Sequence, residues 1–245
     1  MQREYHKWYS PALSREMELL VFGHYGRPLL VFPSAQGRFF DYESNHMIET
    51  IRHAIEGGQV KVYCVDGVDS ESWFNKGLEP RLRVRAHEFY EQYITHEVFP
   101  FLNHNCGSQN VRIAATGSSF GAYHTLNFAL KYPWNFSHVL CFSGNYDIRE
   151  RLEGFYDDSF YFQNPMDYLP NLADNDTLEA IRRIKIALVV GQGAWEGNCI
   201  EQTKRISSIL NDKGIGHHLD LWGNDTPHDW PSWRRMISVY ISQLD

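Results

Sequence analysis

Short apolar runs recur along the chain and alternate with longer stretches in which apolar residues recur at helical spacing. Runs of strand length, rich in β-branched and aromatic residues, lie at 29–33, 59–66, 111–116, 137–144, 184–190 and 217–222. Helical spacing predicts helices over 44–56, 81–103, 122–131, 177–183, 198–213 and 231–241. This alternation predicts an α/β fold, a mostly parallel sheet of about eight strands with helices on both faces.

The start of the sheet has a different pattern. An apolar segment over 17–23 precedes residues 24–27, which have the composition of a hairpin turn, and the buried run 29–33 follows. We therefore expect an antiparallel hairpin between these two segments.

Composition narrows the class of protein. The 245 residues fit one domain over 1–245, and 43% of them are hydrophobic. A net charge of −7 argues against a nucleic-acid partner or an anionic membrane surface. Neither a membrane-span-length apolar run nor a signal-peptide core is visible in the sequence, and the four scattered cysteines indicate reduced thiols, so a cytoplasmic location is expected. A homo-oligomer is left open.

The most informative stretch is Gly117-Ser118-Ser119-Phe120-Gly121. A predicted strand precedes this G-x-S-x-G sequence and a predicted helix follows it, which is the context of a nucleophile elbow. A Cβ at either glycine is expected to collide with neighbouring backbone, and the central serine is expected in strained geometry. An ordinary tight turn between strand and helix is the alternative.

A serine nucleophile needs a base, and in this architecture the base follows the last strand. His228 occupies that position, just before the final helix. The other histidines are placed less well. His217 and His218 lie at the start of the last strand, and the remaining candidates lie on predicted helices: His87, His96, His104 and His124.

The acid that orients the base is expected after the preceding strand. Glu196 is there, in Gly193-Ala194-Trp195-Glu196-Gly197. Glu201 and Asp147 are alternatives, the latter because the acid can follow the strand over 137–144. If Glu196 has no catalytic role, we expect it to be a solvated carboxylate at a helix N-terminus.

The oxyanion hole is expected to combine two backbone N–H groups. One belongs to Phe120, directly after the nucleophile, and the other to Ala35 or Gln36, in the loop after the strand over 29–33. No nucleotide-binding motif or metal-binding spacing is present in the sequence, so we predict no cofactor and no metal.

Residues 145–175 interrupt the alternation with aromatic residues mixed among acids and prolines. Long excursions in compact domains are often lids or binding loops. We interpret this one as a short irregular cap over the serine, with plain surface packing as the alternative. The polar loop over 67–80 could also face a substrate, although a solvated loop is the commoner explanation.

The chain resembles the putative esterase family of the α/β-hydrolase superfamily, which includes S-formylglutathione hydrolases, feruloyl esterases and the antigen 85 mycolyltransferases. The resemblance rests on Leu30-Val31-Phe32-Pro33-Ser34-Ala35-Gln36-Gly37, the elbow, and His228-Asp229-Trp230 with Trp233-Arg234. It implies a Ser-acid-His triad. The loop after Phe32 lacks the family's common His-Gly or Asp-Gly pair, and the acid is Glu where many members have Asp.

These residues predict a serine carboxylic-ester hydrolase that acts on a small to medium acyl ester through an acyl-enzyme. An acyltransferase that uses the same acyl-enzyme is the first alternative. A non-catalytic binding protein on the same fold is the second, and the presence of nucleophile, acid and base in the expected order argues against it.

Overall fold

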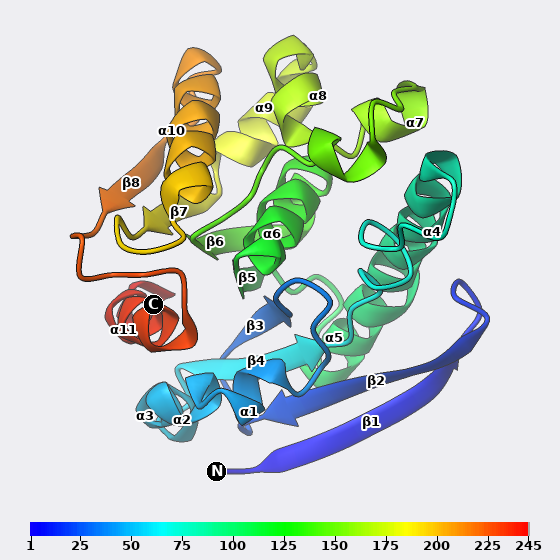
Figure 1. Ribbon diagram of the computed structural model, residues 1–245. Helices are drawn as coiled ribbons and strands as arrows, with labels where there is room; N and C mark the ends of the chain where they lie inside the picture. Colours follow the sequence, from blue (N-terminus) through cyan, green and yellow to red (C-terminus); the bar gives the residue numbers. More distant parts are fainter. Residues whose placement is uncertain (245) are drawn as a thin grey trace.

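The computed structural model describes residues 1–244 and contains one eight-stranded sheet in the order β1-β2-β4-β3-β5-β6-β7-β8 (Figure 1). The pairs β1–β2 and β2–β4 are antiparallel, and all the others are parallel. The strands are β1 (Arg3–Ser10), β2 (Arg15–Phe22), β3 (Arg27–Phe32), β4 (Val60–Val65), β5 (Ile113–Ser118), β6 (Phe136–Phe142), β7 (Lys185–Val190) and β8 (His217–Leu221). The predicted mostly parallel α/β sheet is confirmed.

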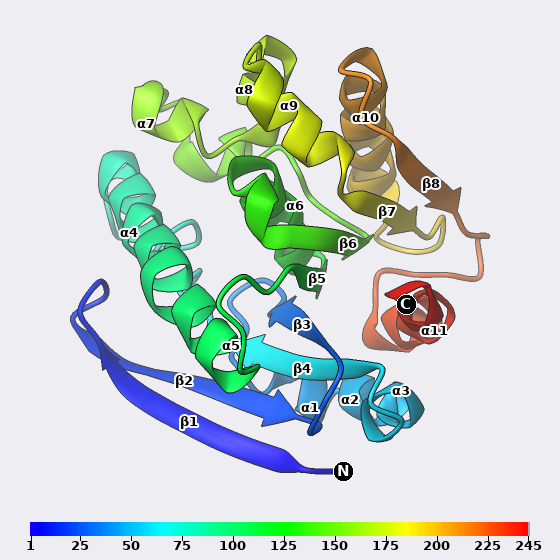
Figure 2. The ribbon, with the colours of Figure 1, turned by 180° about the vertical axis from the view of Figure 1, so that it is seen from behind.

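Helices cover both faces of the sheet, and the core is divided accordingly (Figures 1 and 2). One face packs against α4 (Pro80–Tyr93), η1 (Ile94–Val98), α5 (Phe99–Asn105), α6 (Phe120–Lys131), α9 (Asn175–Arg182) and α10 (Gly197–Asp212). The other packs against α1 (Asp41–Ser44), α2 (Met47–Thr50), α3 (Arg52–Glu56) and α11 (Trp230–Tyr240).

Side chains of the central strands alternate between these two layers. Leu30 and Phe32 of β3 belong to the core beneath α4 and α6, whereas Leu29 and Val31 belong to the core beneath α1 and α11. The period of two is that of a strand, and apolar residues at both parities explain why β3 reads as a continuous apolar run.

The predicted hairpin between 17–23 and 29–33 is wrong. Strand β2 pairs with β1 and with β4, whereas β3 lies between β4 and β5 and is parallel to both. The N-terminal strand β1 was not predicted. Its alternation of exposed and half-buried residues suits an edge strand. β3 has neighbours on both sides within the sheet, which fits its nearly complete burial.

Two predicted segments are more finely divided than expected. The helix predicted over 44–56 is three short helices, and His46 in the left-handed region (φ 61°) precedes the second. The excursion over 145–175 is not irregular throughout, because it contains η3 (Arg149–Leu152), α7 (Asp158–Tyr161) and α8 (Pro165–Asn171). Within residues 1–244, no helix combines the length and apolarity that a membrane crossing requires.

Candidate active site

The elbow has the geometry that its sequence predicts. Ser119 lies between β5 and α6 with φ 57° and ψ −120°, which is a strained conformation for a residue with a side chain. A Cβ on Gly117 would lie 2.3 Å from the carbonyl carbon and oxygen of Gly121, and one on Gly121 would lie 2.5 Å from the carbonyl oxygen of Pro33. Both glycines are therefore required by close backbone approaches.

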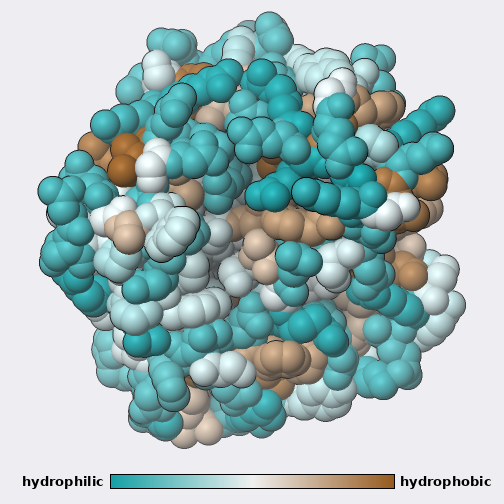
Figure 3. All heavy atoms as spheres, viewed as in Figure 1, coloured by the Kyte–Doolittle hydropathy of each residue, from teal (hydrophilic) through white to brown (hydrophobic). Residues whose placement is uncertain are grey.

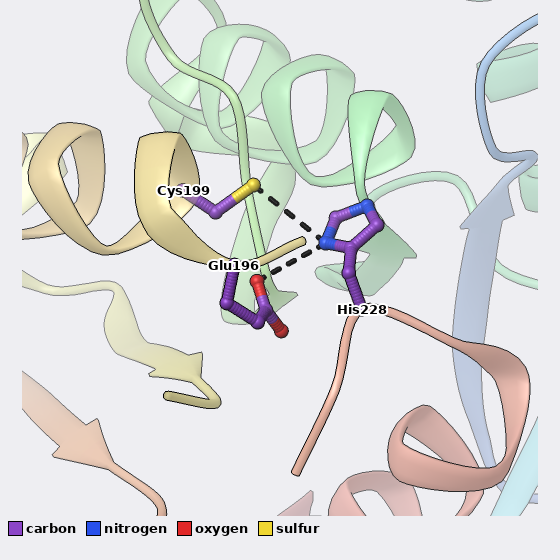
Figure 4. A group of neighbouring side chains, drawn as sticks. All are labelled: Glu196, Cys199 and His228. Carbon is purple, nitrogen blue, oxygen red and sulfur yellow. Dashed lines mark hydrogen bonds and ion pairs between the residues drawn. The ribbon is translucent and has the colours of Figure 1, made fainter. Parts of the chain in front are cut away.

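The ring of His228 lies against the serine. Its Nε2 atom is 2.9 Å from Ser119 Oγ. Its Nδ1 atom is 3.1 Å from Glu196 Oε2, a contact that Figure 4 marks with a dashed line. A neutral ring has one N–H, and the carboxylate can only accept, so Nδ1 carries the proton. Nε2 is then free to accept the proton of the serine hydroxyl.

Glu196 is completely buried, with 0% exposure. It is the N-cap residue of α10, as the alternative interpretation of a carboxylate at a helix N-terminus has it, but it is not solvated. Its Oε1 atom accepts a hydrogen bond from the Ser143 hydroxyl at 2.5 Å. A buried carboxylate needs such donors, because an unpaired charge in the interior is strongly destabilising.

Two loops press together to bring acid and base into contact. The backbone N–H of His228 donates to the Ala194 carbonyl at 2.9 Å, and the backbone N–H of Gly193 donates to the Thr226 carbonyl at 3.0 Å. A Cβ on Gly191 would lie 2.0 Å from the Thr226 carbonyl oxygen. The loops after β7 and β8 can approach this closely only because Gly191 has no side chain.

The loop after β3 lies beside the elbow, because the carbonyl group of Pro33 closely approaches Gly121. Its turn is closed by a hydrogen bond from Gly37 N–H to Ser34 O, and Gln36 has φ 57°. Ala35 packs against the apolar cluster that contains Phe120. Phe120 is the first residue of α6, so its N–H has no intrahelical acceptor.

The alternative acids are engaged elsewhere. Asp147 forms ion pairs with Arg149 and Arg205, and Glu201 is exposed on α10. Asp229 caps α11 by accepting from the Ser232 N–H.

The other histidines are also distributed as the sequence indicates. His217 and His218 begin β8, His96 lies on η1 and His104 on α5. His124 of α6 is buried, with its Nε2 atom 2.8 Å from Asp69 Oδ1, and its ring stacks on His87 of α4.

That contact shows that the loop over 67–80 is not simply solvated. Asp69, Ser72 and Trp73 are all buried. Trp73 belongs to an apolar cluster with Phe120, Tyr123, Ile148, Leu152 and Phe160. The loop after β4 and the excursion over 145–175 are therefore joined to the elbow helix through one common core.

Two residues that contact Glu196 or His228 were not anticipated from the sequence. Ser143, directly after β6, is one, and Cys199 on α10 is the other, with its Sγ atom 3.6 Å from His228 Nδ1 (Figure 4). Burial, followed by the Glu196 carboxylate, raises the pKa of Cys199 to about 12. Glu196, Cys199 and His228 also present three potential metal-ligand atoms within 4.8 Å of one another.

The molecular surface is hollowed at this place. Figure 3 shows the face seen in Figure 1, with a recess near its middle in the region of the amino end of α6. Apolar and weakly polar side chains gather there, and polar ones surround them.

Comparison with protein families gives one assignment that spans nearly the whole chain. The family model described as Putative esterase matches residues 10–241. A comparison with curated protein sequences finds no match.

Solved structures share the fold at low sequence identity. An S-formylglutathione hydrolase from Agrobacterium tumefaciens has a TM-score of 0.77 at 14% identity, with 99% of this chain and 94% of that chain covered. A ferulic acid esterase has a TM-score of 0.75 at 13% identity, with 100% and 98% covered. An S-formylglutathione hydrolase from Staphylococcus aureus has a TM-score of 0.71 at 17% identity, with 99% and 96% covered.

Proposed function

This chain belongs to the Putative esterase family and is a carboxylic-ester hydrolase with the α/β-hydrolase fold, and we propose that Ser119, His228 and Glu196 are its catalytic triad. The resemblance drawn from the elbow and the motif at His228 is thereby confirmed at the level of the family. The single observation that supports the triad is the continuous contact from the Ser119 hydroxyl through the imidazole to a fully buried carboxylate.

The reaction begins when Ser119 Oγ attacks the acyl carbonyl carbon and His228 Nε2 takes the hydroxyl proton. Glu196 holds the ring in the Nδ1–H tautomer and stabilises the imidazolium. The N–H of Phe120, together with that of Ala35 or Gln36, donates to the oxyanion. Each such donor typically stabilises the transition state by about 3 kcal/mol.

The imidazolium then gives its proton to the leaving alkoxide oxygen, and an alcohol departs. The acyl-enzyme that remains is an ester of Ser119. A water molecule attacks it while His228 again accepts a proton, and collapse of the second tetrahedral intermediate releases the acid and restores the serine.

We further propose a small to medium acyl ester as the substrate and the segment 145–175 as a cap. Arg151 in η3 supports the cap, because its guanidinium lies 5.7 Å from the ring centre of Phe120 and 4.2 Å from that of Phe74. The segment thus contacts the residue that follows the nucleophile.

The test is turnover of p-nitrophenyl acetate and butyrate by the wild type and by Ser119→Ala. Loss of the nucleophile should lower kcat by about 10⁴–10⁶-fold. Ser118→Ala is the matched control, since it changes the neighbouring buried serine and should retain activity within several-fold.

Labelling with a fluorophosphonate gives an independent readout. The wild type and Ser118→Ala should be labelled, and Ser119→Ala should not. Equal labelling or equal turnover of the Ser119→Ala protein would rule out this serine as the nucleophile.

A further inference from the structure

The acid and base of the triad share their contact with a third group that the ester reaction does not use. Cys199 lies one turn into α10, three residues after Glu196, and its thiol points at the His228 ring (Figure 4). The Sγ–Nδ1 distance is 3.6 Å and the Nδ1–Oε2 distance is 3.1 Å. Three different donor atoms, sulfur, nitrogen and oxygen, therefore converge on one point.

The Sγ–Nδ1 separation of 3.6 Å matches an edge of a zinc tetrahedron, and all three ligand atoms lie within 4.8 Å of one another. Bond lengths of about 2.3 Å to sulfur and about 2.0–2.2 Å to nitrogen and oxygen imply ligand–ligand distances of about 3.3–3.7 Å. Only small movements of the side chains would be needed to admit an ion. A thiolate and an imidazole favour Zn²⁺ over Mg²⁺ or Ca²⁺, which prefer sets of oxygen ligands.

We propose that Glu196, Cys199 and His228 form an inhibitory site for Zn²⁺ and cations of similar softness. The inhibition rests on the proposed function, because the step that it blocks is proton transfer from Ser119 to His228. The binding site itself depends only on the three ligand atoms.

Inhibition follows from the tautomer that the ion requires. Zn²⁺ takes the lone pair of Nδ1, so the proton that Nδ1 carries in the working enzyme moves to Nε2. Nε2 then has no lone pair for the Ser119 proton. The ion also takes the Glu196 oxygen away from its contact with the ring, so base and orienting acid are lost together.

Binding of the ion also releases a proton from the protein. Cys199 binds as a thiolate, and its proton leaves to solvent, so each ion that binds releases one proton. The titratable groups around the thiol are Glu196, His228 and Tyr146.

The first experiment measures inhibition of the purified, chelator-treated protein by zinc chloride at buffered free concentrations, with p-nitrophenyl acetate as substrate. Cys199→Ala removes one ligand and should raise the half-inhibitory concentration at least tenfold. Cys106→Ala, which changes a half-buried cysteine elsewhere, should leave the half-inhibitory concentration unchanged. If zinc inhibits the Cys199→Ala variant as strongly as the wild type, the proposal is overturned. Circular dichroism of this variant and of Cys199→Ser checks that the fold is retained.

The second experiment does not depend on activity. Co²⁺ bound through a thiolate gives a sulfur-to-cobalt charge-transfer band in the near ultraviolet, and Ser119→Ala protein should show it because Ser119 is not a ligand. Ser119→Ala combined with Cys199→Ala should not. A band in an inactive wild type would mean that the proposed function fails while the metal site stands, and absence of the band would refute the site.

Discussion

Glu196 illustrates how a single side chain links the fold to the chemistry. It begins α10, is fully buried, and divides its two oxygens between His228 and Ser143. Neither oxygen could be left unpaired without a large desolvation cost. The carboxylate is therefore both an orienting group for the imidazole and a structural element of the interior.

Replacing the carboxylate by an amide tests the tautomer argument. In Glu196→Gln, the amide can direct its NH₂ group at Nδ1, which favours the proton on Nε2 and removes the base. We expect kcat to fall by about 10³–10⁴-fold while KM changes little. Steady-state kinetics with p-nitrophenyl butyrate measures this. An unchanged kcat would show that His228 does not need the carboxylate.

Ser143 should act as a positioning residue for Glu196. Ser143→Ala leaves one carboxylate oxygen without its donor, at a cost of about 1–2 kcal/mol in the orientation of the acid, so kcat should fall about tenfold at unchanged KM. Ser207→Ala is the matched control. It removes a buried hydroxyl bonded to His217, at the far end of β8, and should leave kcat as in the wild type. If Ser143 has only a structural role, Ser143→Ala should lower thermal stability without lowering kcat.

The G-x-S-x-G motif selected Ser119, and chain order then selected Glu196 and His228, because each follows a strand whose place in the succession can be counted. Ser143 and Cys199 could not be selected in this way. Ser143 reaches Glu196 only because β6 and β7 are neighbours in the sheet, and Cys199 reaches His228 only because the loops after β7 and β8 touch. Such proximities are set by tertiary packing.

At the scale of elements, the elbow is fixed by its contacts with β3. The amino end of α6 approaches the Pro33 carbonyl so closely that only glycine fits at position 121. The same approach brings the loop that contains Ala35 next to Phe120. One strand–helix contact thus positions Ser119 and brings together the two segments that carry the proposed oxyanion donors.

Gly121→Ala should disrupt that contact. The added methyl group would require the helix or the end of β3 to move, at a cost of about 1–3 kcal/mol, which corresponds to a fall of roughly 2–12 °C in Tm for a chain of this size. Activity should fall by more than the stability loss explains, because the Phe120 N–H moves with the helix. Thermal unfolding and kcat are measured together.

Gly216→Ala provides the comparison, since a Cβ there meets nothing within 4 Å. It should change neither Tm nor kcat appreciably. If Tm fell by the same amount in both variants and both retained full activity, the argument from close approach would fail.

Element types were more predictable than strand pairing. Each apolar run after residue 29 became a strand of the parallel sheet, because burial on both faces leaves a local signature in the sequence. The pairing of β2 had no such signature. Its partners lie at residues 3–10 and 60–65, and the turn composition of residues 24–27 suggested a local hairpin that the sheet does not contain.

The whole molecule has one core on each face of the sheet and a third apolar cluster above the elbow. The third cluster joins the loop after β4, the amino end of α6 and the proposed cap. Arg83, almost fully buried, donates to the carbonyl of Arg151 and so ties α4 to the cap as well. The shape of the acyl site should therefore depend on how these segments are held together.

Arg151→Ala tests that dependence. The guanidinium lies over Phe74 and near Phe120, and contacts of this kind contribute about 0.5–2 kcal/mol. Loosening the cap should change the ratio of kcat/KM between p-nitrophenyl acetate and longer acyl esters by at least threefold. Arg85→Ala is the control, because Arg85 makes a similar contact with Phe89 on an exposed stretch of α4. If Arg151→Ala lowers kcat/KM by one common factor for every chain length, the segment 145–175 supports the fold without selecting the acyl group.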